Sequence, residues 1–479
     1  MRQIGIALGL LLAACSDPCS LTEVQGQLDG ASAGAVVTLP ACRVEGELSV
    51  PAGVTLRGVA GSELASAGPR DIVVELGPGA ALESVALEAG GRAGVVARGD
   101  AAIRDVTVDA RHGVGLYAVG GEVTIERVAV TGPVTREDAA DARWVSVVGA
   151  PSDEACAADC ECEPGEVDAA EDRVCAAGRW RTWAATIGLY ARDATLTLDD
   201  VTIAGMAETG VLADGARLTW SGGGVRDVIG VGVLLRGGTS SLTDVTVERV
   251  VAGLRGVPSY GVIATDAHAM TSARLTVADG ERFGVLMLDA SAEHDALTAR
   301  GNGDVAVWIG DAAGVSITGA SRVEGNGFAG VVVSESRDVT LDGLTVAMTS
   351  TVRRSVGAFG VQEIGDGVQL SGNLGDVALR EVRVEGNARV GLLADVTPGL
   401  SFTDVTVDAS GAAFGALGGT RDAGAGEVTI TSPAGWDTGI TRAGAAVAND
   451  PTASGAFDAI VTALPDGVAG ATGIIGPMY

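Results

Sequence analysis

Hydrophobic and polar residues alternate along this chain in two short phrases that recur from one end to the other. The first is an apolar–polar–apolar triplet such as Val106-Thr107-Val108, and the second is a glycine followed by an apolar run, as in Gly210-Val211-Leu212. Further copies of the first begin at Val128, Val201, Val245, Leu275, Leu344, Val382 and Val405, and further copies of the second begin at Gly94, Gly261, Gly284, Gly330 and Gly391. Apolar–polar alternation is typical of a half-buried β-strand, so the pattern predicts a repeated strand–turn–strand unit.

The spacing of the phrases predicts a solenoid. Where no longer segment intervenes, each phrase returns about every 21 to 24 residues, and a repeat this short cannot bury an apolar face alone. It must stack on its own copies, which predicts one elongated body rather than several globular domains. A leucine-rich repeat would need a recurring Leu frame, whereas this chain repeats Val-Thr-Val. The pattern therefore favours a parallel β-helix.

Three asparagines support this interpretation. Asn302, Asn326 and Asn387 each follow a Gly just after a strand. Asn at a repeated sharp turn is expected to adopt a left-handed conformation and to stack its amide in a ladder. With these residues, and with the opening that ends in Val54-Thr55-Leu56-Arg57-Gly58, the chain resembles the right-handed parallel β-helix superfamily, the pectate-lyase-like fold. The resemblance implies an all-β, right-handed parallel β-helix solenoid from about residue 20 to about residue 440 and leaves the function open.

The first 14 residues have the features of a lipoprotein signal peptide. Arg2 precedes an apolar stretch too short to span a bilayer, and Leu12-Ala13-Ala14-Cys15 resembles a bacterial lipobox, in which the Cys thiol is lipidated. A plain secretory signal is the alternative. Ser16, rather than Asp, after the Cys implies sorting to an outer membrane. The sequence therefore predicts an exported protein that is lipid-anchored to the bacterial cell envelope.

The rest of the chain divides into a cap, a repeating body and a second cap. Ser20-Leu21-Thr22-Glu23 is a capping-box pattern, which predicts a short helix with Leu21, Val24 and Leu28 on the face that covers the first coil. The expected boundaries are residues 1–14 for the signal peptide, 15–34 for the anchor and N-terminal cap, 35–432 for the β-helix with an insertion over 131–186, and 433–479 for a C-terminal cap.

Six cysteines besides Cys15 fit an oxidising compartment. Cys19 and Cys42 flank the N-terminal cap, and Cys156, Cys160, Cys162 and Cys175 lie close together in the sequence. In an exported protein these thiols are expected to form disulfides. A four-Cys zinc site is the alternative for the cluster, although its spacing lacks the paired C-x-x-C arrangement of structural zinc sites.

The acidic composition of the chain limits the kinds of molecule that it is expected to bind. The formal net charge is −29, and the chain has no Lys, so all 32 basic residues are Arg. A strongly acidic surface repels nucleic acid, so no nucleic-acid partner is expected, whereas cations and neutral or basic partners are compatible with it. Solubility alone is the alternative explanation for the charge.

Three segments interrupt the repeat directly after the apolar–polar–apolar strand. They cover about residues 131–186, 248–260 and 347–366, and insertions that share a corner project from one side of a solenoid, where ligands often bind. The first segment carries Trp144, Trp180 and Trp183. These rings predict either stacking on sugar rings or the small core of a disulfide-linked subdomain.

A column of acidic residues is expected at the turn after the second phrase. Its members include the candidate calcium ligands Asp193, Asp214, Asp266, Asp289 and Asp311. Carboxylates stacked about 5 Å apart repel one another unless a cation or water screens them. Calcium binding is one interpretation, and a solvated turn that favours Asp for its backbone hydrogen bonding is the other.

Two charged groups are candidates for catalysis. His268 and His294 fall near corresponding points of successive repeats, beside Asp266 and Asp295, and a His next to a carboxylate can act in acid–base chemistry. Arg353 and Arg354, with Glu363 and Asp366, form the second group, in the third inserted segment.

The motifs of β-helix enzymes give no direct support for an enzyme. Asp199-Asp200 is the one echo of the polysaccharide hydrolase set, and no Asp-Pro-His-Glu-like run of the uronate epimerases is present. We therefore expect an envelope-anchored binding or structural surface protein, with a polysaccharide or an envelope protein as its partner. The alternative is a polysaccharide lyase or hydrolase that uses carboxylates and Arg on the loop-bearing face.

Overall fold

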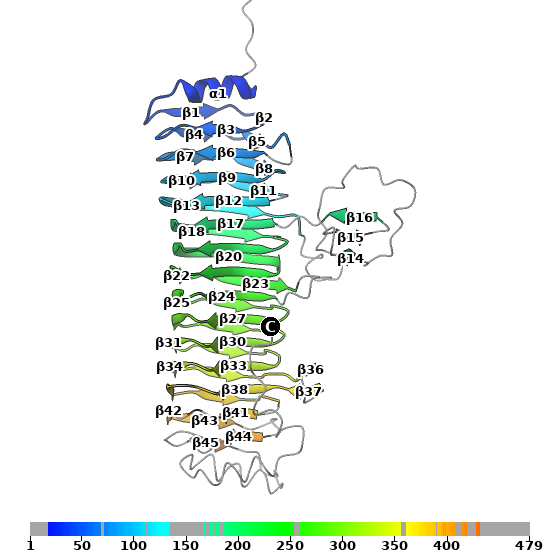
Figure 1. Ribbon diagram of the computed structural model, residues 1–479, viewed down its shortest axis with the longest axis vertical. Helices are drawn as coiled ribbons and strands as arrows, with labels where there is room; N and C mark the ends of the chain where they lie inside the picture. Colours follow the sequence, from blue (N-terminus) through cyan, green and yellow to red (C-terminus); the bar gives the residue numbers. More distant parts are fainter. Residues whose placement is uncertain are drawn as a thin grey trace, which may run out of the picture.

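The computed structural model is a long rod of stacked coils (Figure 1). It describes residues 18–68, 71–111, 113–134, 167–168, 173–176, 179–182, 186–252, 259–355, 361–388, 390–395, 397, 399–408, 414–418 and 428–431. Within these ranges every coil pairs in parallel with the coils before and after it, so the chain is a parallel β-helix, as the repeat predicted.

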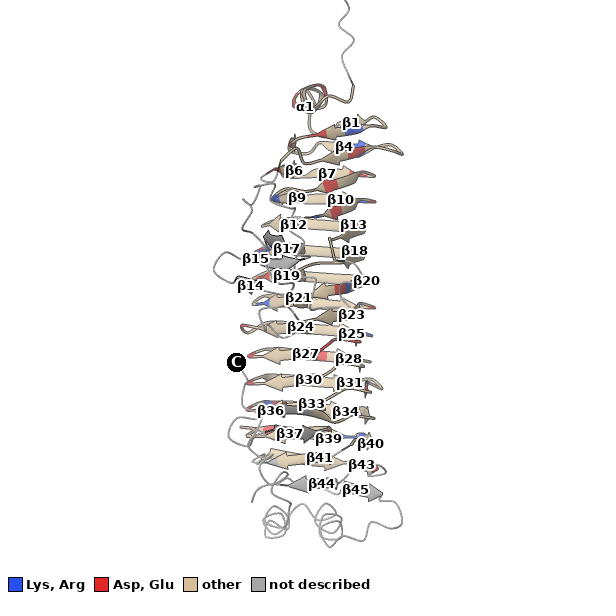
Figure 2. Cartoon of the chain, turned by 90° about the vertical axis from the view of Figure 1, so that its right-hand side faces the viewer, with Lys and Arg blue, Asp and Glu red and all other residues tan. Residues whose placement is uncertain are grey.

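Each coil contributes three strands rather than the two that the sequence phrases predicted. They form three ladders that run the length of the rod, and Figure 2 shows the strands of the third ladder as a column beside strands of the other two. The first ladder contains β1 (Val36–Leu39), β4 (Thr55–Gly58), β7 (Ala80–Glu83), β10 (Ala101–Arg104), β22 (Thr239–Thr243), β25 (Ala269–Ala273), β28 (Ser291–Asp295), β31 (Ala313–Thr318), β34 (Arg337–Asp342), β39 (Asp376–Arg380) and β42 (Gly399–Thr403).

The two sequence phrases form the other two ladders. The second ladder contains β2 (Arg43–Glu45), β5 (Glu63–Ala65), β8 (Ala86–Ala89), β11 (Thr107–Ala110), β23 (Thr246–Val251), β26 (Thr276–Ala278), β29 (Thr298–Arg300), β32 (Arg322–Glu324), β35 (Thr345–Ala347), β40 (Arg383–Glu385), β43 (Val405–Asp408) and β45 (Val428–Thr431). Three long strands continue from the first ladder into the second: β13 (Glu122–Thr131), β18 (Thr195–Ala204) and β20 (Arg217–Ile229).

The glycine phrases lie in the third ladder. It contains β3 (Leu48–Val50), β6 (Ile72–Leu76), β9 (Ala93–Arg98), β12 (Gly113–Val119), β17 (Thr186–Arg192), β19 (Thr209–Asp214), β21 (Val231–Arg236), β24 (Tyr260–Thr265), β27 (Phe283–Leu288), β30 (Val305–Gly310), β33 (Ala329–Ser334), β38 (Asp366–Ser371), β41 (Val390–Asp395) and β44 (Phe414–Gly418).

A continuous apolar interior holds the coils together. Inward side chains of all three ladders are buried, and Leu218, Val247 and Val262, one from each ladder, are at most 1% exposed. Burying such a side chain contributes roughly 1.5–3 kcal/mol to stability, and each coil buries several. The first ladder therefore alternates inward apolar residues with outward polar ones, and its outer face is available to solvent.

The predicted asparagine ladder is present for Asn302 and Asn326, with one correction to its conformation. Asn387 does not extend it, because its Oδ1 accepts from the Thr349 backbone N–H at 3.1 Å. Asn302 and Asn326 are buried, and the Oδ1 atom of Asn326 accepts hydrogen bonds from the Asn302 backbone N–H at 2.9 Å and from its Nδ2 at 3.0 Å. The left-handed residue is the preceding glycine rather than the asparagine, because Gly301 and Gly325 both have φ = +65°. Glycine takes that conformation without a steric cost, which leaves the asparagine side chain free to point inward.

The N-terminal helix forms as the capping pattern predicted. Helix α1 (Leu21–Asp29) begins after Ser20, whose side chain accepts a hydrogen bond from the Glu23 backbone N–H, and it buries Val24 and Leu28 over the first coil. The predicted disulfide in this region joins Cys19 to Cys42. The helix lies across the end of the rod at which the interior would otherwise face water (Figure 1), and the disulfide links the residues before it to the first coil.

The three interruptions leave the rod at one corner, between the second and the third ladder, as predicted. The first contains an antiparallel sheet of β14 (Val167–Asp168), β15 (Arg173–Ala176) and β16 (Arg179–Thr182), and the third contains the antiparallel hairpin of β36 (Val352–Ser355) and β37 (Val361–Ile364). Both project from the same side of the rod in Figure 1. The proposed domain boundaries at 14, 34 and 432 remain predictions. Among the described residues, no helix combines the length and the apolar character that a membrane span requires.

Candidate functional site

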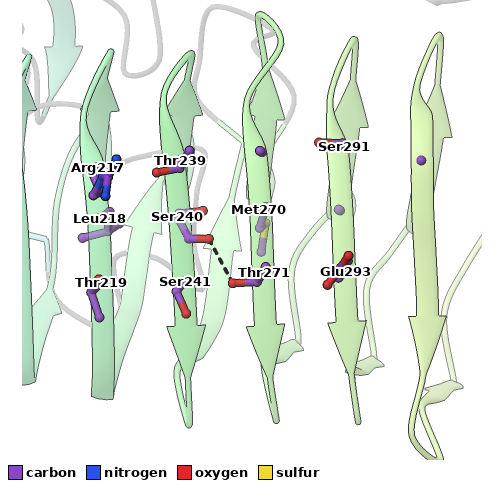
Figure 3. A pocket seen from close by; sticks show the side chains of 13 residues that line it. Arg217, Leu218, Thr219, Thr239, Ser240, Ser241, Met270, Thr271, Ser291 and Glu293 are labelled. Atoms are coloured by element: carbon purple, nitrogen blue, oxygen red, sulfur yellow. Dashed lines mark hydrogen bonds between the residues drawn. The ribbon is translucent and has the colours of Figure 1, made fainter.

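A shallow depression of ≈ 430 Å³ lies on the outer face of the first ladder, across β20, β22, β25 and β28 (Figure 3). Two parallel columns of outward side chains line it, and the strand register sets each column. The first column is Arg217, Thr239, Ala269 and Ser291, and the second is Thr219, Ser241, Thr271 and Glu293. Most of these positions carry a hydroxyl group, which both donates and accepts hydrogen bonds.

Small residues create the depression. Outward side chains on neighbouring strands stand about 5 Å apart, so a run of large side chains would make a level surface. Here Ala269 interrupts the first column, and Gly314 lies at the far margin. The missing side-chain volume leaves a hollow with a hydroxyl-bearing floor.

The depression has an unpaired charge at each end. Neither Arg217 nor Glu293 makes an ion pair with a described residue, and both are exposed. Their neighbours in the register are Thr195 and Thr239 for the arginine, and Thr271 and Ser316 for the glutamate. The site therefore offers one cation, one anion and a set of hydroxyl groups between them.

His268 lies directly beneath this surface. Its Nδ1 atom bonds to the carbonyl oxygen of Gly237, which makes Nδ1 the donor, so Nε2 accepts from the Ser240 hydroxyl at 2.9 Å. Thr271 in turn donates from Oγ1 to the Ser240 carbonyl oxygen at 3.3 Å, the bond drawn in Figure 3. Burial lowers the pKa of His268, while the bond to Gly237 acts in the opposite direction.

The two histidines do not form the exposed catalytic pair that the sequence suggested. His268 is 0% exposed and His294 is 1% exposed, so neither side chain reaches solvent. His294 bonds through Nδ1 to the Ser272 hydroxyl at 2.7 Å, and its Nε2 lies 3.3 Å from the Met287 sulfur. Burial lowers the pKa of His294 to about 4, which keeps the ring neutral at physiological pH.

The acidic partners proposed for these histidines lie elsewhere. Asp266 and Asp295 are both exposed, on the outside of the coils whose interior holds the histidine rings. The register also pairs His294 with Ser272 rather than with His268. A histidine at an inward position of a repeat packs in the interior, so proximity in sequence to an aspartate did not indicate contact.

The second predicted charged group is only partly described. Arg353 and Glu363 are partners across the β36–β37 hairpin, and Arg354 lies beside them; the side chains of these three residues lie outside the described part of the chain. Asp366 does not face a substrate, because it is 0% exposed and accepts a hydrogen bond from Gln369 Nε2 at 2.5 Å. Its proposed role at the surface is therefore wrong.

The backbone conformation explains why aspartate recurs in the acidic column, and one predicted member of the column lies at a different register. Asp193, Asp266, Asp289 and Asp311 have φ between +46° and +57°, in the left-handed region that aspartate tolerates better than most residues. Asp214 does not continue this column, because the register places it between Arg192 and Arg236, and Arg236 binds it at 2.9 Å. Calcium binding stays a prediction; no group of three or more potential ligands of the His, Cys, Asp and Glu types occurs among the described residues.

Several predicted residues lie outside the described part of the chain. These are Cys15, Cys156, Cys160 and Cys162, together with Trp144 and Trp183; of Cys175 and Trp180 the backbone alone is described, as partners in the β15–β16 pairing. The lipid anchor, the disulfides of the Cys cluster and the sugar-binding role of the tryptophans therefore stay predictions.

Sequence reasoning missed a second set of outward residues, on the third ladder. The rings of Tyr117 and Tyr190 stack with centroids 4.9 Å apart, and Tyr260 stacks on Phe283 at 5.1 Å. These aromatic residues follow or precede the glycine phrase at a fixed offset, which is the signal that could have identified them.

One described carboxyl group has a raised pKa. Glu208 lies at the corner between β18 and β19, in the coil that follows the first insertion. Although part of the residue is exposed, the surrounding protein removes enough water from the carboxyl group to raise its pKa.

The comparisons with known proteins concern architecture. No protein-family model and no curated protein matches the sequence. Among solved structures, the chain is similar to a mutant of the periplasmic alginate epimerase AlgG, with 13% identity, a TM-score of 0.41 and coverage of 86% of this chain and 83% of that chain. It is also similar to the catalytic unit of a GH87 α-1,3-glucanase from Streptomyces thermodiastaticus, with 15% identity, a TM-score of 0.37 and coverage of 88% and 68%. A third is the Dettilon tailspike protein, with 10% identity, a TM-score of 0.35 and coverage of 86% and 64%. Nothing about the activity of this chain follows from these similarities.

Proposed function

We propose that this protein is an exported, envelope-anchored β-helix that binds a saccharide chain on its surface without cleaving it. The observation that carries the proposal is the depression of the first ladder, whose two columns place hydroxyl groups at regular intervals on a rigid sheet. Sugars are polyhydroxylated, so such a surface offers them matching donors and acceptors. A rigid sheet also loses little conformational entropy when the ligand binds.

The binding proposal is tested by removing hydroxyl groups one at a time. Thr219→Val keeps the shape of the side chain and deletes one donor and acceptor, so affinity for a bound polysaccharide is expected to fall about fivefold, the equivalent of about 1 kcal/mol. Thr340→Val is the matched control, because Thr340 lies further along the same column and outside the depression. Affinity is measured by calorimetry against neutral and acidic polysaccharides, with and without calcium.

Three results would count against a binding protein of this kind. Equal losses for the two variants would place the ligand elsewhere. Binding of no polysaccharide at all would remove the proposal. Cleavage of a polysaccharide would replace it with the enzyme alternative.

Glu208 is the observation that favours the enzyme alternative. A carboxyl group with a raised pKa stays protonated to higher pH and suits a general acid in a polysaccharide lyase or hydrolase. If the protein cleaves a polysaccharide, Glu208→Gln is expected to lower kcat by 10²-fold or more. Retention of full activity in that variant would exclude this residue as the acid.

A further inference from the structure

The two charges at the ends of the depression lack the partners that charged residues have near the N-terminal end of this face. There, charged residues of neighbouring coils pair: Arg57 lies 2.7 Å from Glu83, and Arg104 lies 3.2 Å from Glu126. Arg217 and Glu293 have hydroxyl-bearing residues in the positions where those partners would stand. Both charges therefore stay free to meet a ligand.

The two groups cannot satisfy each other. They lie on β20 and β28, three coils apart, which corresponds to about 14 Å along the rod axis. That separation exceeds the Debye length of about 8 Å at physiological ionic strength, so their direct attraction is largely screened. A ligand that lies along the depression can reach both.

The net charge of the whole molecule limits which ligands are suitable. At −29, the protein repels a polyanionic saccharide at long range, even though Arg217 would bind one of its carboxylates. A polycationic saccharide is attracted overall but meets the unpaired arginine at one end. A saccharide that carries both charges avoids both the long-range repulsion and the contact between its cation and the arginine.

From this we infer that the depression selects a zwitterionic saccharide, with a carboxylate at Arg217 and an ammonium group at Glu293, and with ring hydroxyls on the Thr and Ser columns between them. The inference rests on the proposed saccharide binding and adds the substrate class. Arg217 supplies a guanidinium that can hold a carboxylate through two hydrogen bonds, and Glu293 accepts from an ammonium group.

Carboxymethyl chitosan oligomers are the test ligand, because they carry both carboxylates and free amines. Their N-acetylated form keeps the carboxylates and loses the amines, chitosan keeps the amines alone, and chitin oligomers are neutral. We expect the zwitterionic oligomer to bind at least about tenfold more tightly than each of the other three, because it alone forms both charge-assisted contacts.

Variants then assign the two charges. Arg217→Gln is expected to abolish the preference for carboxymethyl chitosan over chitosan. Glu293→Gln is expected to abolish the preference for carboxymethyl chitosan over its N-acetylated form. Arg337→Gln is the matched control, since Arg337 is an exposed arginine on the same ladder, outside the depression and without an ion pair among the described residues. All three positions are exposed, so the thermal unfolding midpoint should not change.

The results of these measurements distinguish a failure of the zwitterionic selectivity from a failure of saccharide binding itself. If neutral chitin oligomers bind as tightly as the zwitterionic ones and Arg217→Gln has no effect, the charge selection is wrong while saccharide binding stands. If a saccharide of one charge alone binds best, the zwitterionic class is likewise wrong. If none of the four ligands and no other polysaccharide binds, the proposed function itself fails.

Discussion

The two sequence phrases repeat together because they are in contact in the fold. In the third ladder, Gly261 and Gly330 lie where a Cβ atom would come within 2.4 Å of Val277 Cγ1 and Val346 Cγ1, which belong to the second ladder of the following coil. A Cβ atom on Gly210 would come equally close to Val225 Cγ1. A Cβ atom on Gly210 would also lie 2.5 Å from the carbonyl oxygen of Gly232. Real carbon atoms do not approach so closely, so the valine of one phrase requires the glycine of the other.

Gly210→Ala is therefore expected to destabilise the rod. The added methyl group meets a packed side chain and a backbone oxygen, and overpacking of this kind costs roughly 1–3 kcal/mol. Gly26→Ala is the control, because nothing lies within 4 Å of its added Cβ and alanine favours the helix. Thermal unfolding followed by circular dichroism should show a lower midpoint for the first variant and an unchanged or higher midpoint for the second. Equal midpoints would contradict the packing argument.

Buried histidine gives the rod a pH dependence of defined sign. The pKa of His294 is about 4 in the folded chain and about 6.5 when the chain is unfolded, so between these values the unfolded state binds a proton that the folded state does not. Stability is therefore full above about pH 6.5, falls as the pH drops, and is lower by about 3 kcal/mol below pH 4.

The double variant Ser272→Ala, His294→Leu removes the titrating ring together with its hydrogen-bonding partner. We expect urea unfolding midpoints measured from pH 7 to pH 4 to decline less steeply in this variant than in the wild type. His268 contributes in the same direction in both proteins, so some slope remains. An unchanged slope would show that His294 is protonated in the folded state.

At the scale of elements, the first coil shows how the rod ends without exposing a free sheet edge. Gln25 of α1 donates from Nε2 to the Ser49 carbonyl oxygen at 3.1 Å and accepts from the Ser49 backbone N–H at 3.0 Å. These are the two bonds that another strand would make to β3, the edge strand of the third ladder. One side-chain amide therefore replaces a strand at this point, which blocks pairing with a second molecule.

Gln25→Leu should expose this edge. The variant leaves both polar groups of Ser49 without a protein partner, so we expect a loss of about 1 kcal/mol and concentration-dependent association. Gln27→Leu is the matched control, since Gln27 bonds to Glu23 within the same helix. Sedimentation velocity over a range of concentrations distinguishes the two. A monomeric Gln25→Leu protein would show that the helix protects the edge by coverage alone.

How far the sequence predicts these elements depends on whether a feature repeats. The inward valines, the glycine phrases and the shared corner of the insertions recur often enough to be identified without a structure. The register of Asp214 could not be predicted, because one residue more or less in a turn moves a side chain from the turn into the strand. The depression was missed because Arg217 and Glu293 lie on the ladder that neither phrase marks, and they become neighbours of the same surface only through the register.

At the scale of the whole molecule, the stacked coils and the N-terminal cap form one elongated body with a strongly acidic composition. The Cys19–Cys42 disulfide fits an oxidising compartment, in keeping with the predicted export signal. The first coil follows directly after the cap, so a lipid on Cys15 would hold the rod by its capped end. The depression would then stand well away from the membrane.

The anchor is tested independently of any ligand. We expect the wild-type protein, expressed in a bacterium with its own leader, to partition into the detergent phase of a Triton X-114 extraction and to incorporate labelled palmitate. Cys15→Ser should shift it to the aqueous phase and abolish labelling. Cys42→Ser, which removes the disulfide and leaves the lipobox intact, is the control that should still partition with detergent. Partitioning of the Cys15→Ser protein with detergent would exclude the lipid anchor.

Among the described residues, long additions leave the coil at the corner between the second and the third ladder, whereas the corner between the first and the second varies by only a few residues. Strands on both sides of the corner between the second and the third ladder are already paired with the coils above and below, so a longer connection costs little beyond the entropy of closing a loop, which grows slowly with length. Foreign peptides grafted at this corner in successive coils should therefore lie in a straight row at intervals of about 5 Å. The distance between two grafted epitopes or enzymes is then set by the number of coils between them.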